Sequence, residues 1–145
     1  MQRVLIVNHD EELMLLLKLE IGELRRNVGV DLACSLPAAL ELARSRHPDL
    51  VILGVDNWPE GSRRVLRSLR QLLGTNARFI LVGYPAALQQ HHDQPVVAFL
   101  SRPVQLAPFR AAFGKATLQE AVREDVRGPG ELPAAFTDPD QPVRG

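Results

Sequence analysis

Five short aliphatic runs, each followed by a segment of different character, constrain the fold of this 145-residue chain more than any other feature. The runs are apolar on successive residues, which is typical of strands covered on both faces of a parallel sheet. They lie at Val4–Val7, Val30–Ala33, Leu50–Val55, Phe79–Val82 and Val96–Leu100. We therefore expect five strands with helices on both sides of the sheet they form.

The segments between the runs carry apolar residues at helical spacing. Helices are predicted over Asp10–Arg26, Leu36–Arg46, Ser62–Leu73 and Gln105–Arg123. Ser35 and Gly74 are expected to cap the second and third of these. The core-facing residues are expected to include Leu24, Leu72 and Leu106. The alternation predicts an α/β fold, a (βα)5 doubly wound parallel five-stranded sheet.

The segment Tyr84–Asp93 offers few apolar contacts, so its helix is expected to be short or irregular. The composition changes again near Asp125, where Gly128-Pro129-Gly130 and later prolines stand among scattered charges. Such a sequence has too few apolar residues to pack. We therefore expect a folded domain over residues 1–123 and a disordered tail over residues 124–145.

Composition excludes several classes of function. Lys plus Arg equals Asp plus Glu at 17 each, so no overall field favours nucleic acid or an anionic membrane. The single cysteine, Cys34, excludes an internal disulfide and a cysteine-based zinc site. No apolar run approaches the length of a membrane span, and the start of the chain is expected to be a strand rather than a signal peptide. A cytoplasmic protein without nucleic-acid or membrane partners is predicted.

Several segments resemble the receiver domains of two-component response regulators (CheY-like domains). Val4-Leu5-Ile6-Val7-Asn8-His9-Asp10 is similar to the family's first strand and the acidic pair after it. Pro48-Asp49-Leu50-Val51-Ile52-Leu53 is similar to the run before the phosphoacceptor aspartate, and Phe99-Leu100-Ser101-Arg102-Pro103 to the fifth strand with its lysine-proline pair. The matches follow the family's order over roughly residues 1–123. The resemblance implies the flavodoxin-like receiver topology, with strand order 2-1-3-4-5 and a site at the carboxyl ends of the strands.

The resemblance also implies where the phosphorylation site of a receiver would lie, and the residues there differ. The acidic pair that holds Mg²⁺ in receivers aligns with Asn8 and His9, which are poor substitutes for carboxylates at a hard cation. The phosphoacceptor aspartate aligns with Gly54, which has no nucleophile. No metal and no cofactor are therefore expected.

Three further positions of the same pocket are altered. The hydroxyl residue after the fourth strand aligns with Gly83, the lysine with Arg102, and the aromatic that moves with the hydroxyl residue with Phe99. Loss at all these positions together predicts a degenerate pseudo-receiver without enzymatic activity. Its function would be that of a phosphorylation-independent protein-interaction module in two-component-type signal transduction.

Asp56 leaves two alternatives open. The loop that holds it is one residue longer than the family pattern, so Asp56 is an alternative acceptor and the chain a functional phospho-receiver. Otherwise Asp56 is a turn residue or a partner of Arg102. The pocket is expected to be neutral to positive, and either plugged by Asp56 or weakly attractive to anions through Arg102 and backbone N–H groups. The second version describes a small-anion or ligand-binding flavodoxin-like module.

Two further features have competing interpretations. Trp58 is either an anchor for a partner or folds back to fill the space left by Gly54 and Gly83. The run His91-His92-Asp93 suggests a metal site, but adjacent side chains on a helix do not share a face, so none is expected there.

Two surfaces remain. Leu15, Leu16 and Leu19 widen the apolar stripe of the first helix, which predicts a homodimer or partner interface there, or deep burial between the sheet and the last helix. The arginines of Arg63–Arg70 are expected to form a solvated face, with an acidic partner as the alternative. The resemblance implies partner docking around the fourth helix and strands, where the short Tyr84–Asp93 segment departs from the family.

Overall fold

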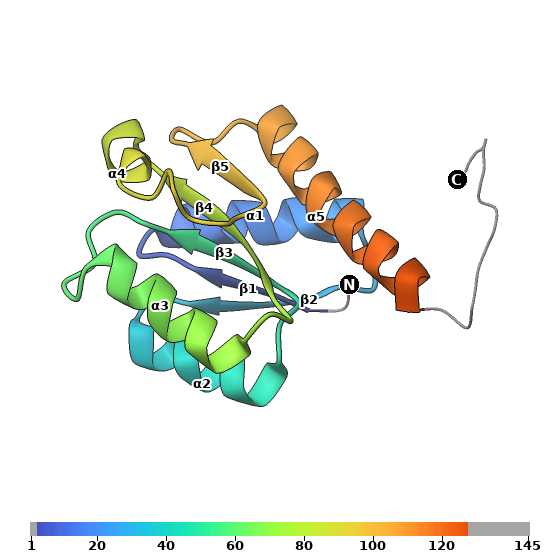
Figure 1. The fold of residues 1–145 in the computed structure, drawn as a ribbon. Helices are drawn as coiled ribbons and strands as arrows, with labels where there is room; N and C mark the ends of the chain where they lie inside the picture. The colour runs from blue at the N-terminus through green and yellow to red at the C-terminus, as the bar shows by residue number, and fades with distance from the viewer. Residues whose placement is uncertain (1–2, 128–145) are drawn as a thin grey trace. The chain divides into compact units, whose positions relative to one another are not determined.

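The computed structural model describes the backbone of residues 3–127 and the side chains of residues 3–117. Strands and helices alternate along this part of the chain, and the strands form one parallel sheet in the order β2-β1-β3-β4-β5 (Figure 1). This confirms the predicted fold class and strand order. The strands are β1 (Arg3–Val7), β2 (Gly29–Ala33), β3 (Leu50–Gly54), β4 (Arg78–Gly83) and β5 (Ala98–Ser101).

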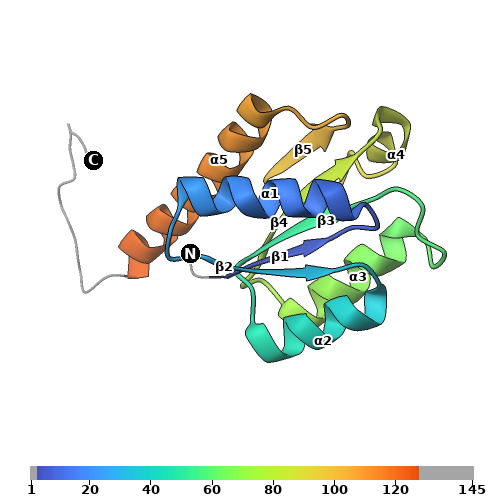
Figure 2. The same cartoon turned by 180° about the vertical axis from the view of Figure 1, so that it is seen from behind.

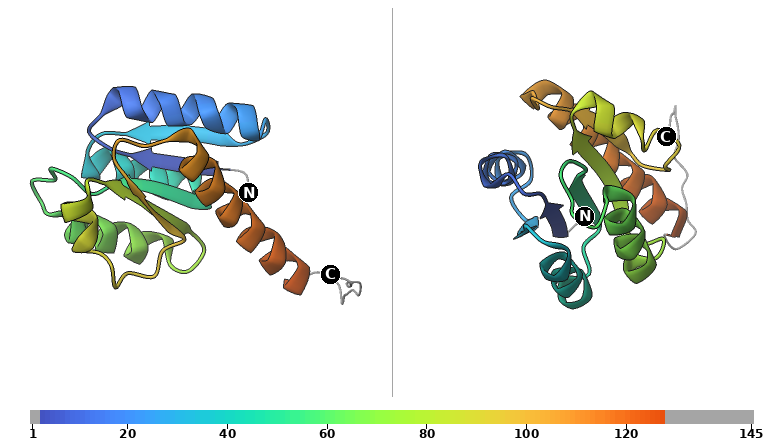
Figure 3. Two further views of the ribbon diagram at one scale, coloured as in Figure 1. Left: turned by 90° about the horizontal axis from the view of Figure 1, so that it is seen from above. Right: turned by 90° about the vertical axis from the view of Figure 1, so that its left-hand side faces the viewer.

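Helices cover both faces of the sheet. Figure 1 shows α2 and α3 on the side nearer the viewer, and Figure 2, from behind, shows α1 in front of the strands. The right-hand view of Figure 3 places α1 on the opposite side of the sheet from α2 and α3. The helices are α1 (Glu11–Leu24), α2 (Leu36–Arg46), α3 (Ser62–Leu73), α4 (Pro85–Gln89) and α5 (Leu106–Arg127).

The helix ends follow the capping residues. Asp10 accepts a hydrogen bond from the Leu13 N–H at 3.1 Å, so it caps α1 instead of forming its first turn. Ser35 accepts from the Ala38 N–H at 3.2 Å and Gly74, with φ 66°, ends α3. The bounds predicted for α2 and α3 and both predicted caps are therefore confirmed, because a cap is readable from local sequence.

Two elements are shorter than typical. The helix α4 has 5 residues, which confirms the prediction for the segment after β4. The strand β5 begins at Ala98, so Val96 and Val97, predicted as strand, belong to the connection before it. The Val97 N–H still donates to the Phe79 carbonyl at 2.8 Å, which guides the chain into the sheet.

The core lies on both sides of β1, β3 and β4, whose residues are buried almost throughout. Three residues predicted to face the core are exposed instead: Leu24, Leu72 and Leu106. Leu24 is the last residue of α1, Leu72 lies in the last turn of α3 and Leu106 is the first residue of α5. A periodic pattern assigns a side chain to one face of a helix, but it does not determine how far the core extends beneath the helix ends.

The chain divides into two compact units, Met1–Ala112 and Phe113–Gly145. The first contains the sheet and α1 to α4, and the described part of the second is helical through Arg127, beyond the predicted helix end at Arg123. Of the predicted tail over residues 124–145, residues 128–145 lie outside the described part. Within the residues described, no helix has both the length and the apolarity needed to span a bilayer.

Candidate functional site

The residues that end or follow β1, β3, β4 and β5 lie together at the carboxyl ends of the strands, where the strand arrows in Figure 1 end. Backbone hydrogen bonds continue the ladder past the strands. The Val55 N–H donates to the Val82 carbonyl at 2.8 Å, and the Arg102 N–H donates to the Gly83 carbonyl at 2.9 Å. The structure thus places Asn8, Gly54, Gly83 and Arg102 at these strand ends, as expected for a parallel sheet.

The side chain of Asn8 fills the space beside Gly54. A β-carbon at Gly54 would lie 2.6 Å from Asn8 Nδ2 and 2.7 Å from Asn8 Cγ, which is shorter than any normal contact. Asn8 is 8% exposed, and its Oδ1 accepts a hydrogen bond from the Asp10 N–H at 3.1 Å. A longer side chain at position 54 therefore has no room unless Asn8 moves.

Gly83 is enclosed in the same way by the loop after β3. A β-carbon there would lie 2.6 Å from Val55 Cγ2 and 3.1 Å from Asp56 Oδ2. Val55 is buried, so it has little freedom to withdraw. A hydroxyl residue at position 83 does not fit this arrangement.

The Asp56 carboxylate binds the start of the segment after β4. Its Oδ2 and Oδ1 accept from the Tyr84 N–H at 3.2 and 3.4 Å. The predicted partner of Asp56, Arg102, is instead paired with Asp10. Asp56 was predicted to fill the pocket, and it does so only beside Gly83. The space beside Gly54 is filled by Asn8.

Arg102 is held by two groups. Its Nη2 lies 2.5 Å from Asp10 Oδ2, and its guanidinium stands over the Tyr84 ring at 5.0 Å from the centroid. The hydrogen bond from the Leu13 N–H lowers the pKa of the Asp10 carboxyl, and Arg102 lowers it further, against partial burial, which raises it. The pocket was predicted to be neutral to positive because Asp10 was not counted in it. The structure adds this carboxylate, which compensates the one guanidinium.

Trp58 folds back against the strand ends. The residue is 8% exposed, Nε1 donates to the Gly54 carbonyl at 2.5 Å, and the ring lies against His9 with centroids 4.1 Å apart. Asn57 has a φ of 61°, a left-handed conformation that asparagine tolerates, and it reverses the loop just before Trp58. Of the two alternatives for Trp58, the structure has the folded-back one, and a role as an exposed anchor is wrong.

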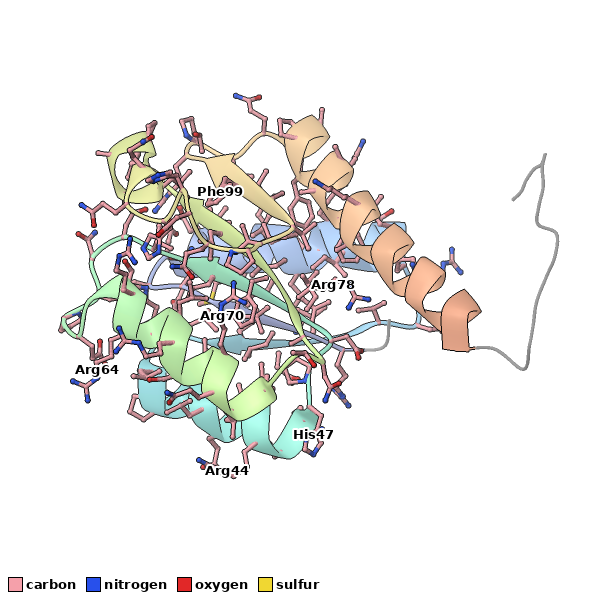
Figure 4. The ribbon with its side chains drawn as sticks, viewed as in Figure 1. Arg44, His47, Arg64, Arg70, Arg78 and Phe99 are labelled. Atoms are coloured by element: carbon pink, nitrogen blue, oxygen red, sulfur yellow. The ribbon has the colours of Figure 1, made fainter. Side chains whose placement is uncertain are left out.

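Phe99 does not join this group. It is exposed on β5 (Figure 4), where it lines a cavity of about 290 Å³ with Pro85, Leu88 and His92. The aromatic position of the predicted pocket therefore belongs to the surface next to α4 and not to the cluster around Gly54.

The residues at the strand ends do not suit Mg²⁺. The cation prefers several carboxylate oxygens, and the two carboxylates here are engaged by Arg102 and by the Tyr84 N–H. Over the part of the chain that the structure describes, no three His, Cys, Asp or Glu side chains are grouped to hold a metal. His91 and His92 also separate, because His91 is buried against Ser62 and His92 is exposed.

The arginines of α3 do more than form a solvated face. Arg63 donates to the Gln90 carbonyl, and Arg70 donates to the Pro95 carbonyl at 2.8 Å. Arg70 also lies over the Phe79 ring at 4.8 Å, and burial lowers its pKa. Figure 4 shows Arg70 directed toward the sheet and Arg64 directed outward. The predicted solvated face is thus wrong for Arg70, which is partly buried, whereas Arg63 is exposed as predicted. Both side chains also bind carbonyl groups of the connection between α4 and β5.

Solved structures of receiver domains resemble this chain. A response regulator receiver domain protein from Clostridium thermocellum matches with a TM-score of 0.70 and 15% identity, over 85% of this chain and 99% of that one. The signal receiver domain of an HD domain-containing protein from Pseudomonas fluorescens Pf-5 matches with a TM-score of 0.70 and 22% identity, over 85% and 92%. A protein from a family of streptococcal redox sensors, described as evolved from two-component response regulators, matches with a TM-score of 0.73 and 18% identity, over 94% and 60%.

No family model matches the chain, and no curated protein matches it in sequence. At these identities the structural likeness establishes the fold. The chain has the receiver fold, with the five-stranded parallel sheet in the receiver order.

Proposed function

We propose that this domain is a phosphorylation-independent protein-interaction module, a pseudo-receiver, of cytoplasmic two-component-type signalling. The observation that carries the proposal is the complementarity of Asn8 and Gly54. Phosphoryl transfer to a receiver needs a carboxylate nucleophile, a divalent cation and a free cationic side chain. In this domain, the side-chain amide of Asn8 occupies the position that the β-carbon of a nucleophilic residue at position 54 would need.

Three charged groups of the pocket already have partners. Asp10 and Arg102 form an ion pair, and the Asp56 carboxylate accepts the Tyr84 N–H. In the proposed function, Asp56 acts as a permanent internal acceptor for this amide and holds the junction of β4 and α4 in one conformation. A receiver that binds partners through such a fixed junction needs no phosphoryl group to be competent.

The surface proposed for partner binding adjoins this junction. Tyr84 and Phe99 are exposed aromatic side chains, and Phe99 lines the cavity beside α4. Exposed aromatic residues next to an apolar hollow are frequent anchors of protein interfaces. Tyr84 connects the surface to the pocket, because its N–H binds Asp56 while its ring contacts Arg102.

The first test is phosphorylation itself. Full-length protein is incubated with acetyl phosphate and Mg²⁺, and its intact mass is measured. The proposal predicts no added phosphoryl group. A phosphoryl group mapped to Asp56 would establish the alternative of a functional phospho-receiver and refute the proposal. Asp56→Asn is the matched variant. If added mass is also found on this variant, the modification is not specific to Asp56.

The second test concerns partner binding. Tagged protein captures its partners from cells of the native host, and the same experiment is carried out with Tyr84→Ala and Phe99→Ala. The proposal predicts that the same partner is captured with or without acetyl phosphate, and that either substitution reduces capture. An Arg64→Ala variant serves as the control, because Arg64 is exposed on α3. Capture that depends on acetyl phosphate would count against the proposal.

A further inference from the structure

The outer face of α1 exposes three leucines. Leu15, Leu16 and Leu19 are 53, 46 and 70% exposed, and Leu19 is the most exposed large hydrophobic residue among those described. The same helix turns Leu13, Leu17 and Ile21 toward the core, so burial against the sheet, one alternative of the sequence analysis, is wrong for the three outer leucines. A continuous apolar face of this kind marks an interaction surface.

Charges of opposite sign flank this face along the helix axis. Glu12 is exposed in the first turn of α1, and Glu23 is exposed in the last turn, which holds no basic residue. Arg26 is exposed two residues after the helix ends. Leu19 stands midway between Glu12 and Arg26 in the sequence. At 3.6 residues per turn, Glu12 and Leu19 lie on the same side of the helix. The face therefore has an acidic start and an apolar centre, Glu23 lies near its end, and the basic group of Arg26 follows after the helix.

We propose that this face pairs with its own copy in a second molecule, with the two α1 helices antiparallel and a two-fold axis at Leu19. In this arrangement Glu12 of each copy faces Arg26 of the other, and the two Leu19 side chains meet at the axis. Leu16 of each copy lies over Gly22 of the other. A two-fold interface is self-complementary, so every contact occurs twice.

Two observations favour this occupant and orientation. A parallel pair would place Glu12 against Glu12 and Arg26 against Arg26, which like-charge repulsion disfavours. Gly22 is exposed, with no atom within 4 Å of a β-carbon built on it, so the helices can approach closely beside it. The antiparallel pair thus places Glu12 beside Arg26 of the other copy and Leu16 beside Gly22 of the other copy.

The interface is expected to be weak and reversible. One helix pair, widened by the hollow of about 260 Å³ that Leu15 lines with Met14, Leu32 and Cys34, is smaller than a permanent dimer interface. We therefore expect a dissociation constant on the order of micromolar. The surface is separate from the strand-end pocket, so this inference does not depend on the proposed function, and either can fail without the other.

Charge reversal tests the orientation. Sedimentation equilibrium on the full chain is expected to show a monomer–dimer equilibrium for the wild type. Glu12→Arg and Arg26→Glu are each expected to weaken it at least tenfold, because both charge pairs become repulsive. The double variant, which exchanges the charges, is expected to return to within about threefold of the wild type. A mixture of the two single variants is expected to form heterodimers, and Arg67→Glu on α3 is the neutral control.

Cross-linking tests the position of the axis. In a Cys34→Ala background, Leu19→Cys is expected to form a disulfide-linked dimer under mild oxidation, since a residue on the axis meets its own copy. Leu72→Cys, an exposed leucine on α3, is the matched control and is expected to remain a monomer.

Two results would overturn the inference. A wild type that stays monomeric at concentrations well above micromolar refutes it. The reaction of Leu19→Cys with a thiol reagent then shows the state of the face in this monomer. Slow reaction means that another segment of the same chain covers the face, and fast reaction means that the face is exposed to solvent. A dimer that neither single charge reversal weakens refutes the antiparallel arrangement.

Discussion

Asn8 and Gly54 are complementary in shape: the amide of Asn8 occupies the volume that a β-carbon at Gly54 would need, 2.6 Å from Nδ2. Asn8 follows β1 and Gly54 is the last residue of the neighbouring strand β3, and the two strands pair in parallel up to Val7 and Leu53. A change at either one alters the other's surroundings. Any side chain at position 54 therefore requires the Asn8 amide to move.

The first prediction concerns this pair. Gly54→Ala is expected to destabilise the fold by about 1–3 kcal/mol, because the added methyl overpacks a buried site. Combining it with Asn8→Ala is expected to cost less than the sum of the two single changes, by about 0.5–3 kcal/mol of coupling. Urea denaturation of the four proteins measures this cycle. Additive effects would show that Asn8 does not fill the space beside Gly54.

The second prediction concerns the hydrogen bond of Trp58. Trp58→Phe keeps much of the apolar contact but leaves the Gly54 carbonyl without the Nε1–H donor, and an unsatisfied buried carbonyl costs about 1–3 kcal/mol. The free energy of unfolding is expected to fall by about that amount. Trp58 is the single tryptophan of the chain, so fluorescence quenching by iodide reports its surroundings directly. Strong quenching in the native state would contradict the folded-back position.

The third prediction concerns the ion pair of Asp10 with Arg102. Asp10→Ala removes both the cap of α1 and the ion pair, and it is expected to destabilise the protein by about 1–2 kcal/mol. Asp10→Ser keeps a capping oxygen and removes the ion pair, so its cost is expected to be smaller. Thermal unfolding ranks the two variants.

The fourth prediction tests the same pair with an anion. Arg102 is neutralised by Asp10 in the wild type, so sulfate is expected to leave the melting temperature unchanged beyond its general salt effect. Asp10→Ser frees the guanidinium, and sulfate is expected to raise its melting temperature. Chloride at equal ionic strength is the control. Equal sulfate stabilisation of both proteins would favour the small-anion alternative for the pocket.

The fifth prediction concerns pH. Burial lowers the pKa of His91, with Arg63 acting in the same direction and Asp93 against it. The unfolded chain therefore takes up a proton near pH 6.5 while the folded chain does not, so stability falls as the pH drops below 6.5 until the folded pKa is reached. For one proton the slope is at most about 1.4 kcal/mol per pH unit. The loss should be absent in His91→Gln and retained in His92→Gln, with urea denaturation at several pH values as the measurement.

Local signals predicted several parts of this structure. The cap at Ser35 and the stop at Gly74 are decided by hydrogen bonds and dihedral angles within a few residues, and α2 and α3 accordingly begin and end where the sequence indicates. The low apolar content after Tyr84 likewise predicted the short α4. Errors appeared where the neighbour is distant in sequence, as with Arg70, which binds the carbonyl of Pro95, 25 residues further along the chain.

By itself, the sequence determined the alternation of strands and helices, the parallel sheet and the absence of a side chain at positions 54 and 83, because these depend on periodicity and residue identity. Only the tertiary structure decided what fills the strand ends. Asn8 rather than Asp56 stands beside Gly54, Asp10 rather than Asp56 pairs with Arg102, and Trp58 turns inward. Those contacts join residues from separate strands and loops, and their geometry is set by how the sheet brings the strand ends together.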